Sequence, residues 1–174
     1  MVHSVELLFD DDTEAAVRQV WQDLADAGIR SLAGHTSPTN RPHVTLTVSE
    51  HLDDAVDESL RTLLSRLPLP CMIGAPMLFG SPRALTLVRL LVPSAELLDL
   101  HAETHRVARP YMPNGPLPHA DPGRWTPHVT LARRVPADLL ATAIGLRRVT
   151  RDIRGTALAL RHWDGNAKVV DPIE

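Results

Sequence analysis

Apolar and polar residues alternate along the chain with two different periods, which predicts a succession of short strands and helices. Residues 43–48 alternate strictly, with Val44, Leu46 and Val48 as the apolar positions, as in a strand with one buried face. Residues 10–27 instead carry apolar positions at helical spacing behind an acidic start, which the positive end of a helix favours. The first half of the chain therefore predicts the order strand–helix–strand–helix–strand, at residues 2–9, 10–27, 43–48, 53–67 and 71–79.

The same order of elements begins again after a Gly-Ser-Pro turn at residues 80–82. Two similar units most often pack about a pseudo-twofold axis. We therefore expect residues 1–174 to form one bilobal domain, with lobe-like repeats at about 1–80 and 84–174. The elements predicted for the second repeat lie at residues 84–92, 94–109, 128–133, 136–146 and 153–163, followed by a short strand at 168–170.

One pentapeptide, Pro-His-Val-Thr-Leu, occurs twice, each time at the third element of a repeat. Successive side chains of a strand point to opposite faces, so His43 and Thr45 share one face, as His128 and Thr130 do. The Val and Leu of each copy then face the core. Under pseudo-twofold packing, the two His-Thr pairs face one another across a central cleft.

Two imidazoles and two hydroxyls in one cleft suit the cleavage of a phosphodiester. An imidazole titrates at about pH 6.5, so one histidine can accept a proton while the other donates one in the same in-line displacement. Hydroxyls can donate hydrogen bonds to the non-bridging oxygens of a phosphate. His43 and His128 are therefore candidate catalytic residues, Thr45 and Thr130 are candidate phosphate-binding residues, and this chemistry requires no metal and no cofactor.

Composition narrows the partners that this chain can bind. With 18 Lys and Arg against 21 Asp and Glu, the net charge is −3. This charge argues against binding of long nucleic acid but is compatible with binding of a small anion or of the end of a strand. The single cysteine, Cys71, excludes an internal disulfide and suits a cytoplasmic protein. We expect no signal peptide, no membrane association and no obligate protein partner, since apolar runs are far shorter than the ~20 residues of a membrane span.

Two His-x-Thr motifs, one in each lobe of a duplicated unit of this size, resemble the two-histidine (2H) phosphoesterase superfamily. Within it the chain looks most like the bacterial proteins named 2'-5' RNA ligase or RNA 2',3'-cyclic phosphodiesterase. The resemblance implies an α+β fold of two lobes, with antiparallel-rich sheets lining a central cleft and helices on the outside. It implies a hydrolase of RNA processing that converts 2',3'-cyclic phosphate ends of RNA, or small cyclic nucleotides, to 2'-phosphates, with weak reverse ligation. By the same resemblance, His43 and His128 are the acid–base pair and Thr45 and Thr130 bind the phosphate.

Two other interpretations stay open. A non-catalytic module would bind a nucleotide phosphate through the same motifs and release no product. A metal hydrolase would use His101 and His105, which share one helix face, although Ala102 stands where the metalloprotease pattern places its Glu. Trp125, three residues before His128, is a candidate for stacking on a nucleobase.

Overall fold

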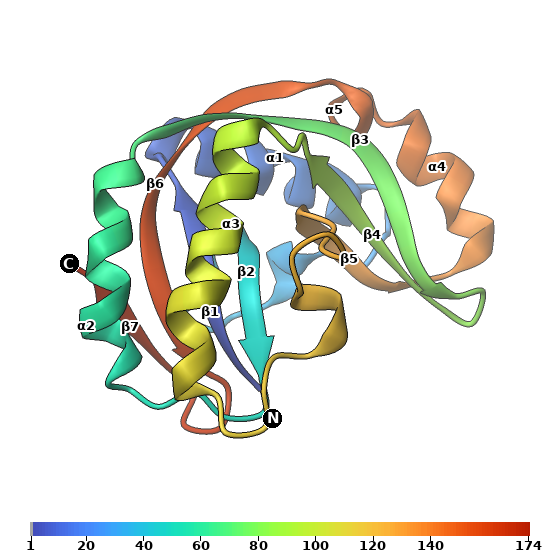
Figure 1. The fold of residues 1–174 in the computed structure, drawn as a ribbon. Coiled ribbons are helices and arrows are strands. Elements are labelled where there is room, and N and C mark those ends of the chain that lie inside the picture. Colours follow the sequence, from blue (N-terminus) through green and yellow to red (C-terminus); the bar gives the residue numbers. More distant parts are fainter. Residues whose placement is uncertain (1) are drawn as a thin grey trace.

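The computed structural model describes residues 2–174, which form one seven-stranded sheet with helices around it (Figure 1). The strands are β1 (His3–Phe9), β2 (His43–Ser49), β3 (Leu69–Ser81), β4 (Ala84–Leu91), β5 (His128–Val135), β6 (Ile153–Asp164) and β7 (Val169–Ile173). Their order is β2-β1-β6-β3-β4-β5, with β7 paired to β6, and every pair is antiparallel. The predicted α+β class and its antiparallel pairing are confirmed.

The helices are α1 (Asp11–Asp26), α2 (Val56–Leu60), α3 (Ala95–Ala108), α4 (Leu140–Gly145) and α5 (Arg147–Thr150). Helix α1 begins where predicted because the Asp10 carboxylate accepts the backbone N–H of Thr13 at 2.9 Å. Two predicted helices are divided: residues 53–67 hold α2 and a 3₁₀ helix at Arg61–Arg66, and residues 136–146 hold a 3₁₀ turn and α4. None of the helices in residues 2–174 is both long and apolar enough to cross a membrane.

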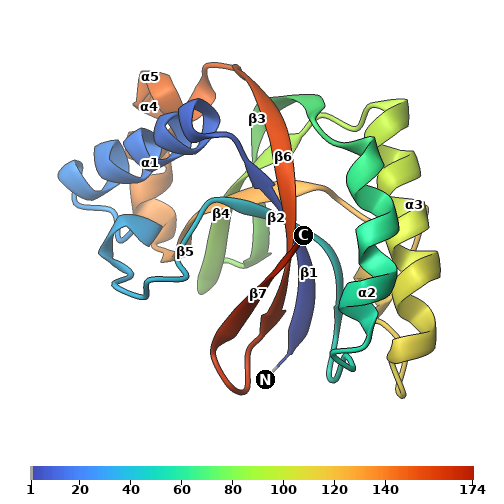
Figure 2. The ribbon, with the colours of Figure 1, turned by 90° about the vertical axis from the view of Figure 1, so that its left-hand side faces the viewer.

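Each half of the sheet contains one strand from the other predicted repeat. β6, from the second predicted repeat, lies beside β1, and β3, from the first, lies beside β4. Helix α3 of the second repeat likewise packs against α2 and β2 of the first. Figure 2 shows α2 and α3 as one group of helices and α1, α4 and α5 as another. The division into lobe-like repeats at about 1–80 and 84–174 stays a prediction, and any such repeats share their strands.

The apolar side of each repeated pentapeptide lies in the core. Val44, Leu46, Val129 and Leu131 are each at most 1% exposed. Burying a side chain of this size contributes about 1.5–3 kcal/mol. These residues therefore fix which face of each strand turns inward, and they leave the histidines and threonines on the other face.

Candidate active site

The two motif strands meet although they stand at opposite ends of the sheet order. β2 and β5 approach each other, and a β-bridge joins the chain before β2 to β5. Thr45 and His128 line a pocket of about 450 Å³. His43 lines an adjoining pocket of about 370 Å³, and the two pockets share Thr45 and Val48. Each histidine thus lines one of two pockets that adjoin at Thr45 and Val48, and we call the two pockets together the cleft.

Each motif strand carries a β-bulge at the leucine that ends the pentapeptide. The register of β2 with β1 shifts between Thr45 and Thr47, so that Leu46 is the extra residue, and β5 shifts against β4 in the same way at Leu131. A bulge interrupts the alternation of faces. Beyond each bulge the alternation is therefore shifted: Val48, which is buried at 8% exposure, lines the cleft, while Thr47 is buried with its hydroxyl unpaired.

Both histidines are held by the same kind of contact. The Nδ1 of His43 lies 2.7 Å from the carbonyl oxygen of Arg41, and the Nδ1 of His128 lies 2.7 Å from that of Thr126. A carbonyl oxygen can only accept a hydrogen bond, so Nδ1 is the donor in both rings. Each Nε2 is thereby left as the atom that can exchange a proton with a ligand in the cleft.

Indole donors fix the backbone at both threonines. Trp125 Nε1 donates to the Thr45 carbonyl at 2.9 Å, and Trp21 Nε1 donates to the Thr130 carbonyl at 3.0 Å. β2 and β5 are edge strands of the sheet, so the indoles satisfy carbonyls that the ladder leaves open. The Thr130 side chain itself is partly buried and lines neither pocket of the cleft.

Trp125 contributes to stability as well as to the cleft wall. Its ring stacks on His101, with ring centroids 3.9 Å apart. We expect Trp125→Phe to keep this stacking but to orphan the Thr45 carbonyl, which should lower the free energy of unfolding by about 1–3 kcal/mol. Urea denaturation measures the loss. Trp163→Phe, which removes no such bond, is the control, and equal losses in the two variants would contradict the expectation.

The floor of the cleft is charged beside His43. Glu6 of β1 stands opposite Thr45 on one side and Arg161 of β6 on the other, so the three side chains share a face. Arg161 Nε donates to Glu6 Oε2 at 2.7 Å, and the two side chains are only 7% and 5% exposed. The other carboxylate oxygen of Glu6 lies 3.6 Å from His43 Nε2. A protonated His43 therefore has an ion-pair partner in the cleft floor.

The matching floor beside His128 is apolar. Val88 and Met77 occupy on β4 and β3 the positions that the charged pair occupies on β1 and β6. Phe79 packs edge-to-face with the His128 ring, with centroids 4.8 Å apart. Burial lowers the pKa of His128 below its ordinary value, and repulsion from His43, His119 and Arg133 adds to this, although the contact with the Thr126 carbonyl opposes it. The two histidines thus share a tautomer but lie in opposite surroundings.

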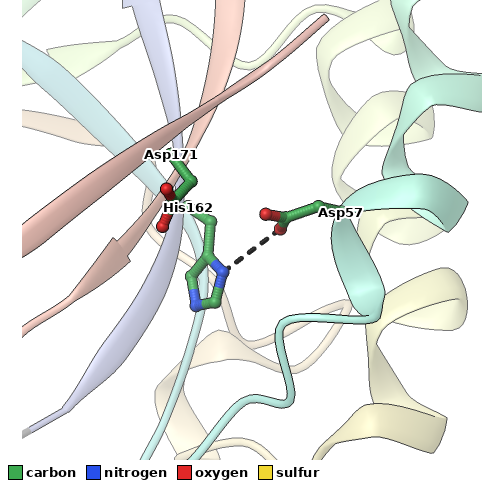
Figure 3. Close-up of side chains that lie close together, drawn as sticks. All are labelled: Asp57, His162 and Asp171. Carbon is green, nitrogen blue, oxygen red and sulfur yellow. Dashed lines mark hydrogen bonds and ion pairs between the residues drawn. The ribbon is translucent and has the colours of Figure 1, made fainter.

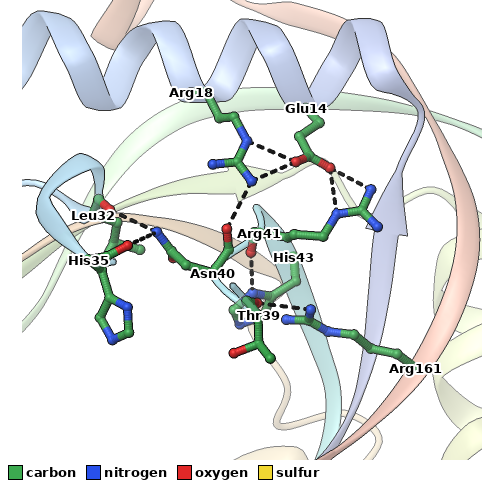
Figure 4. A network of polar contacts seen from close by, with 9 residues as sticks. All are labelled: Glu14, Arg18, Leu32, His35, Thr39, Asn40, Arg41, His43 and Arg161. Carbon is green, nitrogen blue, oxygen red and sulfur yellow. Dashed lines mark hydrogen bonds and ion pairs between the residues drawn. The ribbon is translucent and has the colours of Figure 1, made fainter. Parts of the chain in front are cut away.

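A network of polar contacts holds the loop before β2 (Figure 4). Glu14 of α1 accepts two hydrogen bonds from Arg41, at 2.8 and 2.6 Å. Arg161 of the cleft floor donates to the Thr39 carbonyl at 3.0 Å. The Arg41 carbonyl that orients His43 is therefore part of a fixed segment.

Sequence reasoning missed Glu6 and Arg161. A signal for Glu6 was present, because it is a carboxylate between two apolar residues, Val5 and Leu7, in a strand whose residues are all buried. A buried charge requires a partner. The identity of that partner depends on β6 lying beside β1, which no local pattern in residues 2–9 shows.

His101 and His105 do not form a metal site with each other. His101 is 2% exposed, and its Nε2 donates to the Ala120 carbonyl at 3.0 Å. His105 lies 3.9 Å from Asp121. Within residues 2–174, neither histidine belongs to a group of three ligating side chains close enough for one metal ion. The geometry favours a supporting role for His101 under Trp125 over the metal-hydrolase interpretation.

Solved structures with the same fold cover nearly the whole chain. Kluyveromyces marxianus Usb1 with uridine monophosphate is 13% identical, with a TM-score of 0.54 and coverage of 99% of this chain and 97% of that one. E. coli LigT complexed with 3'-AMP is 15% identical, with a TM-score of 0.56 and coverage of 99% and 94%. The protein TT0787 of Thermus thermophilus is 16% identical, with a TM-score of 0.58 and coverage of 100% and 96%. At these identities the likeness concerns the fold alone.

The sequence comparisons decide the family. No curated protein matches the chain in sequence. The sequence profile described as "2'-5' RNA ligase superfamily" matches residues 9–167, which includes both strands that line the cleft. The chain therefore belongs to the 2'-5' RNA ligase superfamily, a group of two-histidine phosphoesterases.

Proposed function

We propose that the chain is a phosphodiesterase that hydrolyses 2',3'-cyclic phosphate ends of RNA, or small cyclic nucleotides, to 2'-phosphates by metal-independent acid–base catalysis. The observation that carries the proposal is the pair of Nε2 atoms left free by matching Nδ1–carbonyl contacts in one cleft. Membership of the superfamily supports phosphodiester chemistry. Two structures of the same fold contain nucleotides, 3'-AMP in LigT and uridine monophosphate in Usb1, which supports a nucleotide as the ligand.

In the proposed reaction, a water oxygen attacks the phosphorus of the cyclic phosphate. One histidine Nε2 takes a proton from that water, the bond between phosphorus and the ribose O3' breaks, and the other histidine donates its Nε2 proton to O3'. The product is a 2'-phosphate with a free 3'-hydroxyl. Thr45, which lines both pockets of the cleft, donates a hydrogen bond to a non-bridging oxygen, and the repeated motif assigns the same role to Thr130, whose hydroxyl reaches the phosphate only if its side chain turns toward the cleft. A 5'-hydroxyl in place of water would join two ends through a 2'-5' bond by the same proton transfers.

The surroundings of the two histidines suit one of them to act as the general base and the other as the general acid. His128 lies against Phe79 in the apolar half of the cleft, which favours the neutral ring that a general base requires. The Nε2 of His43 lies 3.6 Å from a Glu6 carboxylate oxygen, which can pair with the imidazolium that a general acid requires. We therefore assign the base to His128 and the acid to His43, for hydrolysis and for ligation by a 5'-hydroxyl alike, with the roles exchanged when the ribose 3'-hydroxyl attacks to form the cyclic phosphate.

The pocket beside His128 suits the nucleoside. Trp125 and Phe79 line it with aromatic rings, on which a nucleobase can stack. His119 and Arg124 line the same pocket and provide donors for anionic or carbonyl oxygens. Both belong to the loop before β5, so this loop is the part of the chain that we expect to set substrate size.

The function is tested by incubating the protein with adenosine 2',3'-cyclic phosphate in EDTA and following the products by phosphorus NMR. We expect the cyclic signal to be replaced by that of the 2'-phosphate alone. Binding of the nucleotide without any product would identify a non-catalytic module. Activity that vanishes in EDTA and returns with zinc would identify a metal hydrolase. Either result would overturn the proposal.

The pH dependence of kcat/KM separates the two histidines. A general base works only when neutral, so activity falls as the pH drops through its pKa. Because burial lowers the pKa of His128, we expect the acidic limb to lie below about pH 6.5, the ordinary value for histidine. Phe79→Ala should admit water to the ring and move this limb upward. A wild-type limb above that value would argue against His128 as the base.

A further inference from the structure

A second group of titratable side chains lies on the face of the sheet opposite the cleft. His162 follows Arg161 on β6, so its ring points away from the cleft, and it is 0% exposed. Asp57 reaches it from α2, and Asp171 of β7 stands directly opposite it in the strand pair (Figure 3). One ligand atom from each of the three side chains lies within 4.8 Å of the others. We propose that Asp57, His162 and Asp171 bind a divalent transition-metal ion.

The donor atoms and the spacing of one ligand pair fit such an ion. Bonds of about 2.1 Å to a metal place neighbouring ligand atoms about 3.0–3.4 Å apart. His162 Nδ1 lies 3.2 Å from Asp57 Oδ1. One imidazole with two carboxylates suits Zn²⁺ or Mn²⁺, whereas Mg²⁺ and Ca²⁺ favour oxygen ligands alone. Asp171 is exposed, so water can complete the coordination.

A buried histidine behind His162 supplies the support that a metal ligand needs. The Nε2 of His162 lies 3.3 Å from Nδ1 of His3, and the Nε2 of His3 lies 3.4 Å from Asp164 Oδ1. With a metal on Nδ1 of His162, its Nε2–H donates to His3, and the Nε2–H of His3 donates to Asp164, which requires the Asn166 side-chain amide, whose Nδ2 lies 3.1 Å from His3 Nε2, to turn its oxygen toward His3. Metal-bound histidines almost always donate their second ring N–H to a partner of this kind, which fixes the tautomer and the ring orientation.

The charge balance of the group also favours a cation. Two carboxylates, Asp57 and Asp171, lie beside His162, which is charged only if protonated and whose Nδ1 is 3.2 Å from Asp57 Oδ1. Within residues 2–174, no ion pair links Asp57 or Asp171 to a Lys or Arg side chain. A divalent ion supplies the missing positive charge. It would tie α2 and β7 to β6, and it would stabilise the fold without touching a substrate in the cleft.

Zinc titration of the full chain tests the site by calorimetry and by thermal unfolding. We expect one Zn²⁺ per chain and a rise in Tm of at least about 5 °C at a free zinc concentration of 100 times Kd. Mg²⁺ at the same concentration should leave Tm nearly unchanged. Asp171→Asn, at an exposed position that tolerates the change, should weaken zinc binding at least about tenfold.

Two control variants test whether zinc binds at the proposed site and not at other exposed carboxylates or histidines. Asp99→Asn removes an exposed carboxylate of α3, and His105→Ala removes a histidine of the same helix; both should bind zinc as the wild type does. Equal zinc affinity in the wild type and Asp171→Asn would overturn the proposal, since it would show that the ion binds elsewhere. Failure of the wild type to bind zinc at all would overturn it as well.

Discussion

Replacing either cleft histidine with alanine is expected to remove most of the turnover. His43→Ala and His128→Ala should each lower kcat/KM for a nucleoside 2',3'-cyclic phosphate by at least about 10²-fold, the scale of a lost general acid or base. The Kd for the product nucleotide should change far less, because the pocket walls remain in place. Steady-state hydrolysis in EDTA measures the first quantity, and calorimetry with the product measures the second.

His105→Ala is the matched control for these variants. His105 is a partly buried histidine of α3 that lines neither pocket of the cleft. It should therefore keep the activity of the wild type. If a cleft variant stayed active while His105→Ala lost activity, the catalytic site would lie on α3 and the proposed reaction would need another pair of residues.

Glu6→Ala is expected to destabilise the fold by about 3–5 kcal/mol. The change leaves the Arg161 guanidinium buried at 7% exposure without its counter-charge. The Ser4 hydroxyl, which donates to Glu6 at 2.9 Å, loses its acceptor at the same time. Urea denaturation measures the loss, and a Glu6→Ala/Arg161→Met double variant should recover part of it, because no charge is then left buried.

Glu14→Ala provides the contrast for this prediction. Glu14 also binds two arginines, but Arg18 and Arg41 are 43% and 37% exposed, so water replaces the lost carboxylate. We expect a loss of no more than about 1 kcal/mol. Equal losses for Glu6→Ala and Glu14→Ala would mean that water reaches the pair in the cleft floor, contrary to its burial.

The features that sequence alone could predict are those that local chemistry determines. The acidic start of α1, the apolar faces of the motif strands and the alternation of His43 with Val44 each depend on neighbours within a few residues. The repeat of one pentapeptide added a constraint between distant segments, since it predicted that two His-Thr pairs serve one site. The two histidines do line one cleft in the structure.

The features that sequence could not predict depend on which strands pair. The bulges at Leu46 and Leu131 follow from the register of β2 with β1 and of β5 with β4, and the first of them turns the buried Val48 toward the cleft. The exchange of β6 and β3 between the two halves of the sheet brings Arg161 to Glu6. The same exchange makes the cleft unequal, with a charged floor beside one histidine and an apolar floor beside the other.

A comparison of two leaving groups tests most directly which histidine is the general acid and which is the general base. The ribose O3' of a nucleoside 2',3'-cyclic phosphate needs a proton to depart, and the attacking water needs a base. In a nucleoside 2'-(p-nitrophenyl) phosphate the 3'-hydroxyl attacks phosphorus and p-nitrophenolate departs without a proton, so His43 takes the proton of the 3'-hydroxyl. The account predicts that His128→Ala loses at least about 10²-fold on the cyclic phosphate and little on the aryl ester, while His43→Ala loses on both. The reverse pattern, or an equal loss on both substrates for His128→Ala, would contradict the assignment of His43 as the acid and His128 as the base.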